Sequence, residues 1–201
     1  DIAQKAGILC NARGAILVDE HMRTSKPDIY AVGDAIAVTN FVTKQEAYIP
    51  LAGPANKQGR IAANHICGRN VSFKGTQGTS ILKLFDMTVA TTGIHELQAK
   101  QSNLDYDTII TYSPSHATYY PNAKNMMIKT IFEKQSGKIL GAQLVGYEGV
   151  DKRCDVLATA IRAGMTAYDL TELELAYAPP FSSAKDPVNM IGFAIENILT
   201  G

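Results

Sequence analysis

The sequence is poor in cysteine and has no excess of charge of either sign. Its three cysteines, Cys10, Cys67 and Cys154, form no CxxC pair, so nothing points to zinc binding or dithiol redox chemistry. They indicate a reducing, cytoplasmic environment. Lys plus Arg equals Asp plus Glu at 19 each, which leaves no basic surplus for nucleic acid. No apolar run approaches the length of a membrane span, so we expect neither a nucleic-acid nor a membrane partner.

A second absence concerns the motif that binds the pyrophosphate of a dinucleotide. Such a site shows G-x-G-x-x-G between a strand and a helix, and this motif does not occur in the 201 residues. The chain begins DIAQKAGILC, with neither an initiator Met nor a targeting segment. We therefore interpret it as the carboxyl-terminal part of a longer protein.

The first third of the chain has the pattern of a nucleotide-binding α/β layer. Short apolar runs predict strands over 15–18 and 29–32, and a helix follows over 52–66, with Gly68 at its carboxyl cap. The segment GRNVSFKGTQG has three glycines and little periodicity, which is typical of a domain boundary. We expect residues 1–76 to be the remnant of one domain and residues 77–201 to form another.

Residues 77–201 show strands grouped with separate helices, which predicts an α+β fold with an antiparallel sheet. The patterns predict a hairpin of 81–85 and 88–94, a third strand over 107–112, and strands 126–133 and 138–145 paired across Ser136-Gly137. Helices are expected over 96–102, 150–162 and 187–199. Asp186 is the expected N-cap of the last helix, with Pro187 at its first position.

The run TSKPDIYAVGDA over 24–35 ends in the pair Gly33 and Asp34. Its apolar centre predicts a buried strand, which Pro27 separates from any preceding helix. Gly33 permits close backbone approach, and Asp34 at the strand's carboxyl end can accept hydrogen bonds from sugar or ribityl hydroxyls. On the residues alone, a strand closed by a Gly-Asp turn explains the run more simply.

The helix expected over 52–66 begins with an unusual number of small residues, in YIPLAGPANKQGRIAANHI. Small side chains bury little area but allow close approach to a backbone or a flat ring. Close packing of the helix on a sheet and a cofactor role account for them equally well.

These stretches together resemble the pyridine nucleotide-disulfide oxidoreductases. The run over 24–34 is similar to the family's second FAD motif, and the likeness continues through LAGPANKQGRIAANHICG, YYPNAK, GKILGAQLVG, GVDKR and LAYAPPFSSAKDPVN. The resemblance covers nearly the whole chain. It points to the branch of coenzyme A-disulfide reductases, NADH oxidases and persulfide reductases.

The resemblance implies an FAD-dependent, homodimeric enzyme that uses NAD(P)H. By this resemblance Asp34 binds the ribityl chain of the flavin, and Gly33 leaves room for the cofactor beside the backbone. The backbone N–H groups of Leu51, Ala52 and Gly53 are then directed at the flavin ring. The FAD pyrophosphate loop, the nicotinamide domain and the catalytic cysteine are then expected outside this chain. Residues 77–201 resemble the dimerisation domain, and a last helix rich in apolar residues is expected to join a two-fold interface.

Tyr119, Tyr120 and Tyr177 lie in stretches without core periodicity, and on the residues alone they are ordinary half-buried tyrosines. The resemblance implies that two tyrosines lie beside the partner subunit's active cysteine, and Tyr119 and Tyr177 match those positions best. Lys152 and Arg153 in GVDKR are expected to be exposed, either solvating a helix start or facing coenzyme A phosphates.

The loop LAYAPPFSSAKDP contains no histidine, which disfavours a His-assisted dithiol mechanism. His21, His65, His95 and His116 show no metal spacing and are expected at the surface or at caps. The leading function is reduction of coenzyme A disulfide or persulfide through a single cysteine. An NADH oxidase or peroxidase, and a dimerisation module without catalysis, are the alternatives.

Overall fold

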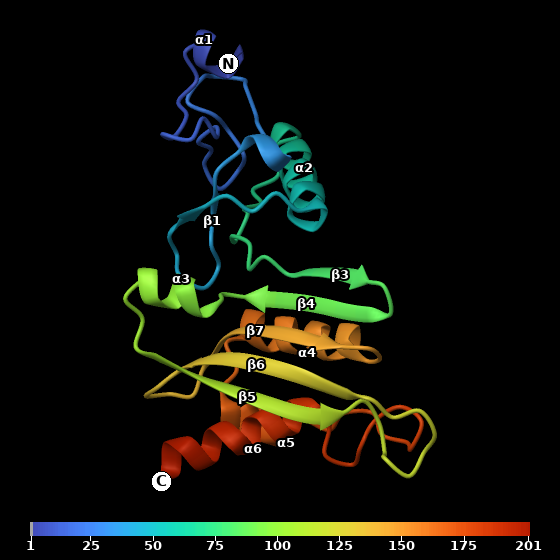
Figure 1. Cartoon of the computed structure of the whole chain (residues 1–201). Helices are drawn as coiled ribbons and strands as arrows, with labels where there is room; N and C mark the ends of the chain where they lie inside the picture. The colour runs from blue at the N-terminus through green and yellow to red at the C-terminus, as the bar shows by residue number, and fades with distance from the viewer. Residues whose placement is uncertain (1) are drawn as a thin grey trace. The chain divides into compact units, whose positions relative to one another are not determined.

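The computed structural model describes residues 2–201 and divides into two compact units, one ending at Gly78 and one spanning Thr79–Gly201 (Figure 1). Each unit is described by itself. The elements of the first are α1 (Ile2–Lys5), the 3-10 helix η1 (Gly33–Ala35), β1 (Val38–Thr39), β2 (Glu46–Ala47) and α2 (Ala52–Ile66).

The helix predicted over 52–66 is confirmed as α2, Ala52–Ile66. Its carboxyl end closes where expected, since the Gly68 N–H donates to the His65 carbonyl at 2.9 Å and the Arg69 N–H donates to the Asn64 carbonyl at 2.9 Å. The helix packs against η1, and Ala62 joins a small core with Met22, Ile36 and Val38.

The two strands predicted over 15–18 and 29–32 are wrong. Ile16 makes isolated bridges to Cys10 and Ile36, and Tyr30 makes one to Arg23. A strand is held by a ladder of bonds to its neighbours, and single bridges leave the backbone irregular. The run before Gly33 is also not buried, because Ile29 and Val32 are 41% and 37% exposed.

The second unit is built on a five-stranded antiparallel sheet with the strand order β3-β4-β7-β6-β5. Its strands are β3 (Ser80–Leu84), β4 (Met87–Gly93), β5 (Tyr106–Pro114), β6 (Asn125–Glu133) and β7 (Ile139–Gly146). Its helices are α3 (Glu96–Gln101), α4 (Val150–Ala163), α5 (Ala167–Glu172) and α6 (Pro187–Thr200). The α+β fold with an antiparallel sheet is confirmed.

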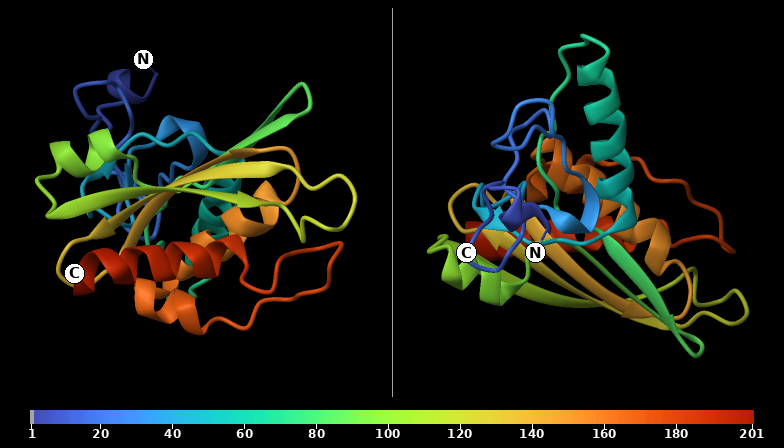
Figure 2. Two further views of the ribbon diagram at one scale, coloured as in Figure 1. Left: turned by 60° about the horizontal axis from the view of Figure 1, so that its bottom comes forward. Right: turned by 90° about the horizontal axis from the view of Figure 1, so that it is seen from above.

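Helices cover one face of this sheet. α4 packs on β4 and β7, α6 packs on β5, and α5 packs against α6, as the left view of Figure 2 shows. The face of α6 that carries Val188, Ile191 and Ile195 is fully buried, in the i, i+3, i+7 spacing of an amphipathic helix. Asp186 caps α6 as predicted, since its side chain accepts the Val188 N–H at 3.0 Å.

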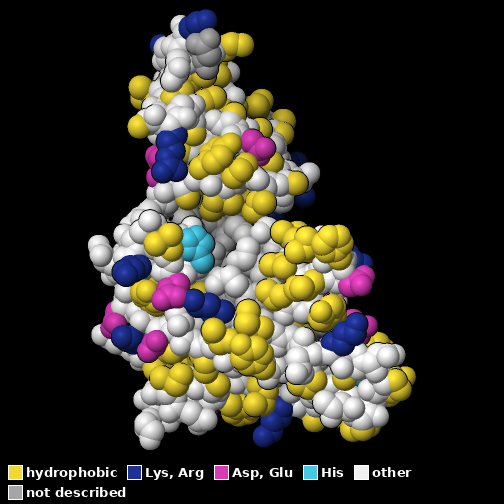
Figure 3. All heavy atoms as spheres, in the orientation of Figure 1, with side chains coloured by type: hydrophobic (Ala, Val, Ile, Leu, Met, Phe, Trp, Pro, Cys, Tyr) yellow, Lys and Arg dark blue, Asp and Glu magenta, His cyan; other side chains and the backbone are white. Residues whose placement is uncertain are grey.

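The opposite face of the sheet carries a row of apolar side chains that crosses all five strands. The strand register aligns Leu82, Val89, Val145, Met127 and Tyr112. Side chains alternate along a strand, so this row faces away from the buried Ala90, Leu144 and Ile128. Hydrophobic side chains gather over β3 and β4 in Figure 3. Of the row, Leu82 is 56% exposed.

The first hairpin differs from its prediction by one residue. Leu84 pairs with Met87, so the two-residue turn is Phe85-Asp86 and not Asp86-Met87. Two-residue hairpin turns of the common type need positive φ, and Phe85 takes φ +52 while its side chain stays 91% exposed. No helix within residues 2–201 is long and apolar enough to span a bilayer.

Candidate functional site

Two tyrosines from distant parts of the second unit meet at its surface. Tyr119 lies in the loop 115–124 between β5 and β6, and Tyr177 lies in the loop 173–186 between α5 and α6. Their phenol oxygens are 3.3 Å apart, within hydrogen-bond distance. The side chains are 75% and 49% exposed, so they are more open than the half-buried tyrosines expected. The pair can contact a molecule outside this unit.

The hydrogen bond to Tyr177 raises the pKa of Tyr119 above its ordinary value. With its pKa raised, the Tyr119 hydroxyl keeps its proton at neutral pH and remains a hydrogen-bond donor. Protonated phenols can donate to an electron-rich sulfur. The arrangement suits stabilisation of a leaving thiolate.

The neighbouring Tyr120 is placed differently. Its ring meets the edge of the His116 imidazole at 5.9 Å and 75°. His116 itself is only 5% exposed, so the expectation of a surface or capping residue is wrong for it. Its Nε2 lies 3.0 Å from the Pro121 carbonyl and its Nδ1 lies 3.0 Å from the Ser115 hydroxyl, which fixes the loop from inside. A buried imidazole with both ring nitrogens hydrogen-bonded holds this loop together.

The other three histidines belong to other elements. His95 is the N-cap of α3 and accepts the Gln98 N–H, which confirms a capping role. His21 and His65 stack at 4.6 Å in the first unit, and Tyr30 bonds His65 at 2.8 Å. The described residues contain no group of three or more acidic, histidine or cysteine side chains arranged to hold a metal ion.

The structure corrects the placement of Arg153. It was expected at the surface, but it is 1% exposed and among the most deeply buried large side chains of the protein. It forms an ion pair with Asp186, with Nη2 at 2.9 Å from Oδ2 and Nε at 3.3 Å from Oδ1. A buried cation cannot contact a phosphate in solvent, so of GVDKR only Lys152, with a 35% exposed side chain, retains that option.

Gly33 and Asp34 lie in η1, not at the end of a strand. Gly33 has φ +71, a left-handed conformation that a side chain would strain, and this explains the glycine. Its N–H donates to the buried Gln58 side chain at 2.8 Å, which ties the motif to α2. Asp34 is exposed, and no described residue bonds its carboxylate. That carboxylate is available to the hydroxyls of a ligand.

The amino end of α2 offers free backbone donors. Leu51 is the N-cap and its side chain makes no capping bond, and the first turn contains no acidic residue. Ala52 and Gly53 are exposed, and a Cβ added at Gly53 would meet nothing within 4 Å. Close helix-to-sheet packing within this chain therefore does not explain that glycine. Unsatisfied N–H groups and the helix dipole favour an electron-rich ligand edge here.

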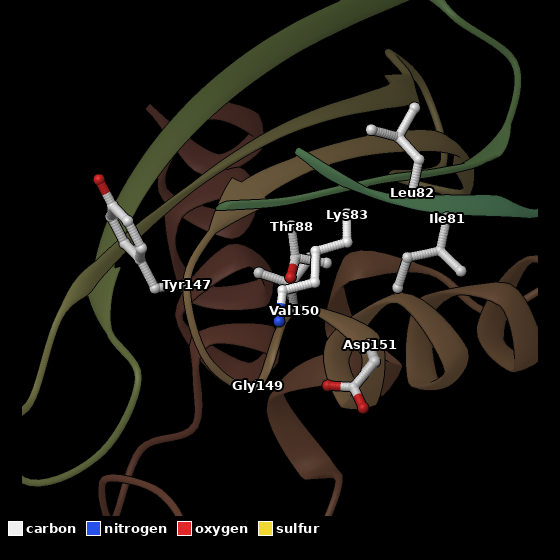
Figure 4. A pocket seen from close by; sticks show the side chains of 8 residues that line it. All are labelled: Ile81, Leu82, Lys83, Thr88, Tyr147, Gly149, Val150 and Asp151. Atoms are coloured by element: carbon white, nitrogen blue, oxygen red, sulfur yellow. The ribbon is translucent and has the colours of Figure 1, made fainter. Parts of the chain in front are cut away.

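A pocket of about 400 Å³ lies between the β3–β4 hairpin and the start of α4. In Figure 4 the Lys83 side chain points from the hairpin towards the helix start at Gly149 and Val150. No site residue predicted from the sequence lines this pocket. The tyrosine pair and Asp34 are exposed instead.

Comparison with known proteins follows the same two units. The profile of the pyridine nucleotide-disulphide oxidoreductase dimerisation domain matches residues 79–187, and the profile of pyridine nucleotide-disulphide oxidoreductase matches residues 1–59. The coenzyme A disulfide reductase of Staphylococcus epidermidis is 39% identical over 191 residues, which are 94% of this chain and 43% of that protein. The chain thus spans less than half the length of this relative.

Two solved structures superpose on the entire chain. Reduced CoADR-RHD of Bacillus anthracis is 55% identical with a TM-score of 0.97, and 36% of its chain is covered. The NAD-dependent persulfide reductase from A. fulgidus is 48% identical with a TM-score of 0.96, and 37% of its chain is covered.

Proposed function

Because the chain belongs to the pyridine nucleotide-disulphide oxidoreductase family, we propose that it is the carboxyl-terminal part of a homodimeric flavoenzyme that reduces coenzyme A disulfide or persulfide. The family uses FAD and NAD(P)H. Residues 1–76 complete an FAD-binding domain, and residues 77–201 form the dimerisation domain. The reactive cysteine belongs to the part of the enzyme outside these residues.

The observation that carries the proposal is the pair of exposed phenols, Tyr119 and Tyr177, with oxygens 3.3 Å apart. The cysteine thiolate attacks one sulfur of the substrate disulfide, forms a mixed disulfide and expels the other sulfur as coenzyme A thiolate. The two phenols donate hydrogen bonds to that departing sulfur. No histidine lies in the 173–186 loop, and His116 of the other loop is buried with both ring nitrogens bonded. The two exposed phenols are therefore our proposed donors.

The first unit has features that suit FAD. The exposed Asp34 carboxylate accepts hydrogen bonds from the ribityl hydroxyls. The backbone N–H groups of Leu51, Ala52 and Gly53 at the start of α2 face the flavin ring. FAD, when bound, supplies two-electron transfer from NAD(P)H to the mixed disulfide. Gly33 keeps Asp34 in place through its bond to Gln58.

The assembly and its location follow from surface and thiol chemistry. The exposed apolar row through Leu82 and Tyr112 supports a homodimer in which both subunits build one active site. Cys10, Cys67 and Cys154 are free thiols, which supports a cytoplasmic location.

The test replaces Tyr119 and Tyr177 together by Phe in the full-length enzyme. Stopped-flow kinetics then separate reduction of the flavin by nicotinamide from reduction of coenzyme A disulfide. We expect the second step to slow about ten- to hundredfold, the scale of a lost positioned donor, and the first to stay near its normal rate.

Tyr120→Phe is the matched control, because it removes a neighbouring hydroxyl that lies outside the pair. It should leave both steps unchanged. Equal losses in both half-reactions of the double variant would mean that the pair is structural. No loss in either, with oxygen consumption intact, would favour an NADH oxidase instead.

A further inference from the structure

The buried guanidinium of Arg153 lies between the two loops that carry the tyrosines. Its Nη2 donates to the Ser115 carbonyl at 3.1 Å, at the start of the Tyr119 loop. The same nitrogen donates to the Ser182 hydroxyl at 3.1 Å and to Asp186 at 2.9 Å, in the Tyr177 loop. One side chain on α4 thus bonds both loops.

Other hydrogen bonds also join the two loops. The Ala117 N–H is shared between the Pro179 carbonyl at 3.3 Å and the Ser182 carbonyl at 3.1 Å. The phenols themselves form a further link, at the exposed tips. Arg153 lies on the buried side of this junction, where its bonds are shielded from water and are stronger than those at the surface.

Resting on the proposed role of the two tyrosines, we propose that Arg153 is a positioning residue that holds the Tyr119 and Tyr177 loops in register so that their phenols meet. Its 1% exposure means that it does not touch substrate and acts through the loops. Misplacement of a donor by about 1 Å is enough to cost a large factor in rate, so a clamp at the loop bases matters for the tips.

The local backbone is shaped for an arginine at this position. Gly149, the N-cap of α4, has φ +70, and a Cβ built there would lie 2.1 Å from Nη1 of Arg153. Nη1 instead donates to the Gly149 carbonyl at 3.2 Å. The glycine that opens GVDKR therefore makes room for the guanidinium of Arg153, four positions later.

Lysine cannot replace this geometry. The guanidinium uses three nitrogens that point in fixed directions, towards Gly149, Asp186 and the Ser115–Ser182 junction. The lysine side chain is one bond shorter, so its ammonium would lie near the position of the arginine Cζ. It can keep the charge next to Asp186 but not the contacts that Nη2 makes with Ser115 and Ser182. Arg153→Lys therefore separates the clamp from the simple neutralisation of Asp186.

The geometry of the pair is tested by photo-oxidative dityrosine cross-linking of the full-length enzyme, with mass spectrometry to identify the Tyr119–Tyr177 product. We expect Arg153→Lys to lower the yield severalfold and to slow the disulfide half-reaction about ten- to hundredfold, with flavin reduction unchanged. Arg162→Lys, an exposed position on the same helix, is the matched control and should keep both at wild-type values.

A folded Arg153→Lys enzyme with normal cross-link yield would overturn the inference. If that variant does not fold, Ser182→Ala carries the test, because it keeps the Arg153–Asp186 pair and removes the bond from Arg153 to the Tyr177 loop that lies nearer to Tyr177 in sequence. A wild-type yield in Ser182→Ala would then count against the clamp. If the yield falls but both Arg153→Lys and the double Tyr→Phe enzyme turn over normally, the clamp stands and the proposed function fails.

Discussion

Replacing Asp186 by Asn should be one of the most destabilising single changes in the second unit. Asp186 is 2% exposed, and its carboxylate accepts bonds from Arg153, from the Ser182 hydroxyl at 2.6 Å and from the Val188 N–H at 3.0 Å. Asn is nearly the same size and is itself a good N-cap, so the cap of α6 survives. What is lost is the negative charge beside a buried cation.

Removing one partner of a buried ion pair costs about 3–5 kcal/mol, because the remaining charge stays desolvated without compensation. We therefore expect the free energy of unfolding to fall by about that amount at pH 7. Urea denaturation followed by circular dichroism measures it. Asp169→Asn is the matched control, since Asp169 occupies a capping box at the exposed start of α5 and pairs with no buried cation.

The effect should also depend on pH in a defined direction. Burial alone would raise the pKa of Asp186, but the bonds from Arg153, Ser182 and the Val188 N–H outweigh it and hold the pKa below its usual value. A depressed folded-state pKa gives stability that is fully present above the unfolded pKa of about 3.9 and is lost as the pH falls through the lower folded value. The difference between wild type and variant should stay constant from neutral to mildly acidic pH and shrink below about pH 4.

A loss no larger than that of Asp169→Asn would refute this reasoning, as would a wild-type advantage that grows below pH 4. Either result would mean that solvent reaches the Arg153–Asp186 pair.

Three other outcomes are expected. Asp34→Ala in the full-length enzyme should weaken FAD binding by about 1.5–3 kcal/mol, through loss of a charged acceptor, and normal flavin absorbance per subunit would contradict the assignment. Burial, with smaller effects from Asp155 and Asp151, raises the pKa of the Cys154 thiol to about 11. A thiol reagent at pH 8 should therefore label the exposed Cys67 quickly and Cys154 only after unfolding, and equal labelling rates would contradict this. The protein should sediment as a dimer at micromolar concentration, and a monomer would count against the apolar row as an interface.

Local signals in the sequence predicted the helices well. The signals that end α2, α4 and α6 lie within a few residues of each helix end, such as Asp186-Pro187 before α6 and Gly68 after α2. The β6–β7 pairing was equally accessible, because a short turn joins two apolar runs. The short helix α5 was not predicted, although Thr166 and Asp169 form its capping box and are a readable signal.

The strands expected over 15–18 and 29–32 failed for a different reason. An apolar run becomes a strand only when a neighbouring strand completes its ladder, and the described chain offers Ile16 and Tyr30 isolated bridges alone. The Gly33-Asp34 motif was found because its residue types are special in themselves. Its setting in a 3-10 turn tied to Gln58 depends on a contact 25 residues away.

The sequence by itself determined the fold class, the helix ends and the presence of tyrosines outside the core, since these rest on short-range propensities and patterning. Only the tertiary structure decided that Tyr119 and Tyr177, 58 residues apart in sequence, meet. It also decided that Arg153, which follows the more exposed Lys152, is buried against Asp186, 33 residues later. A charged side chain is buried where partners from several elements converge on it. That convergence is a property of packing, which no local stretch of residues records.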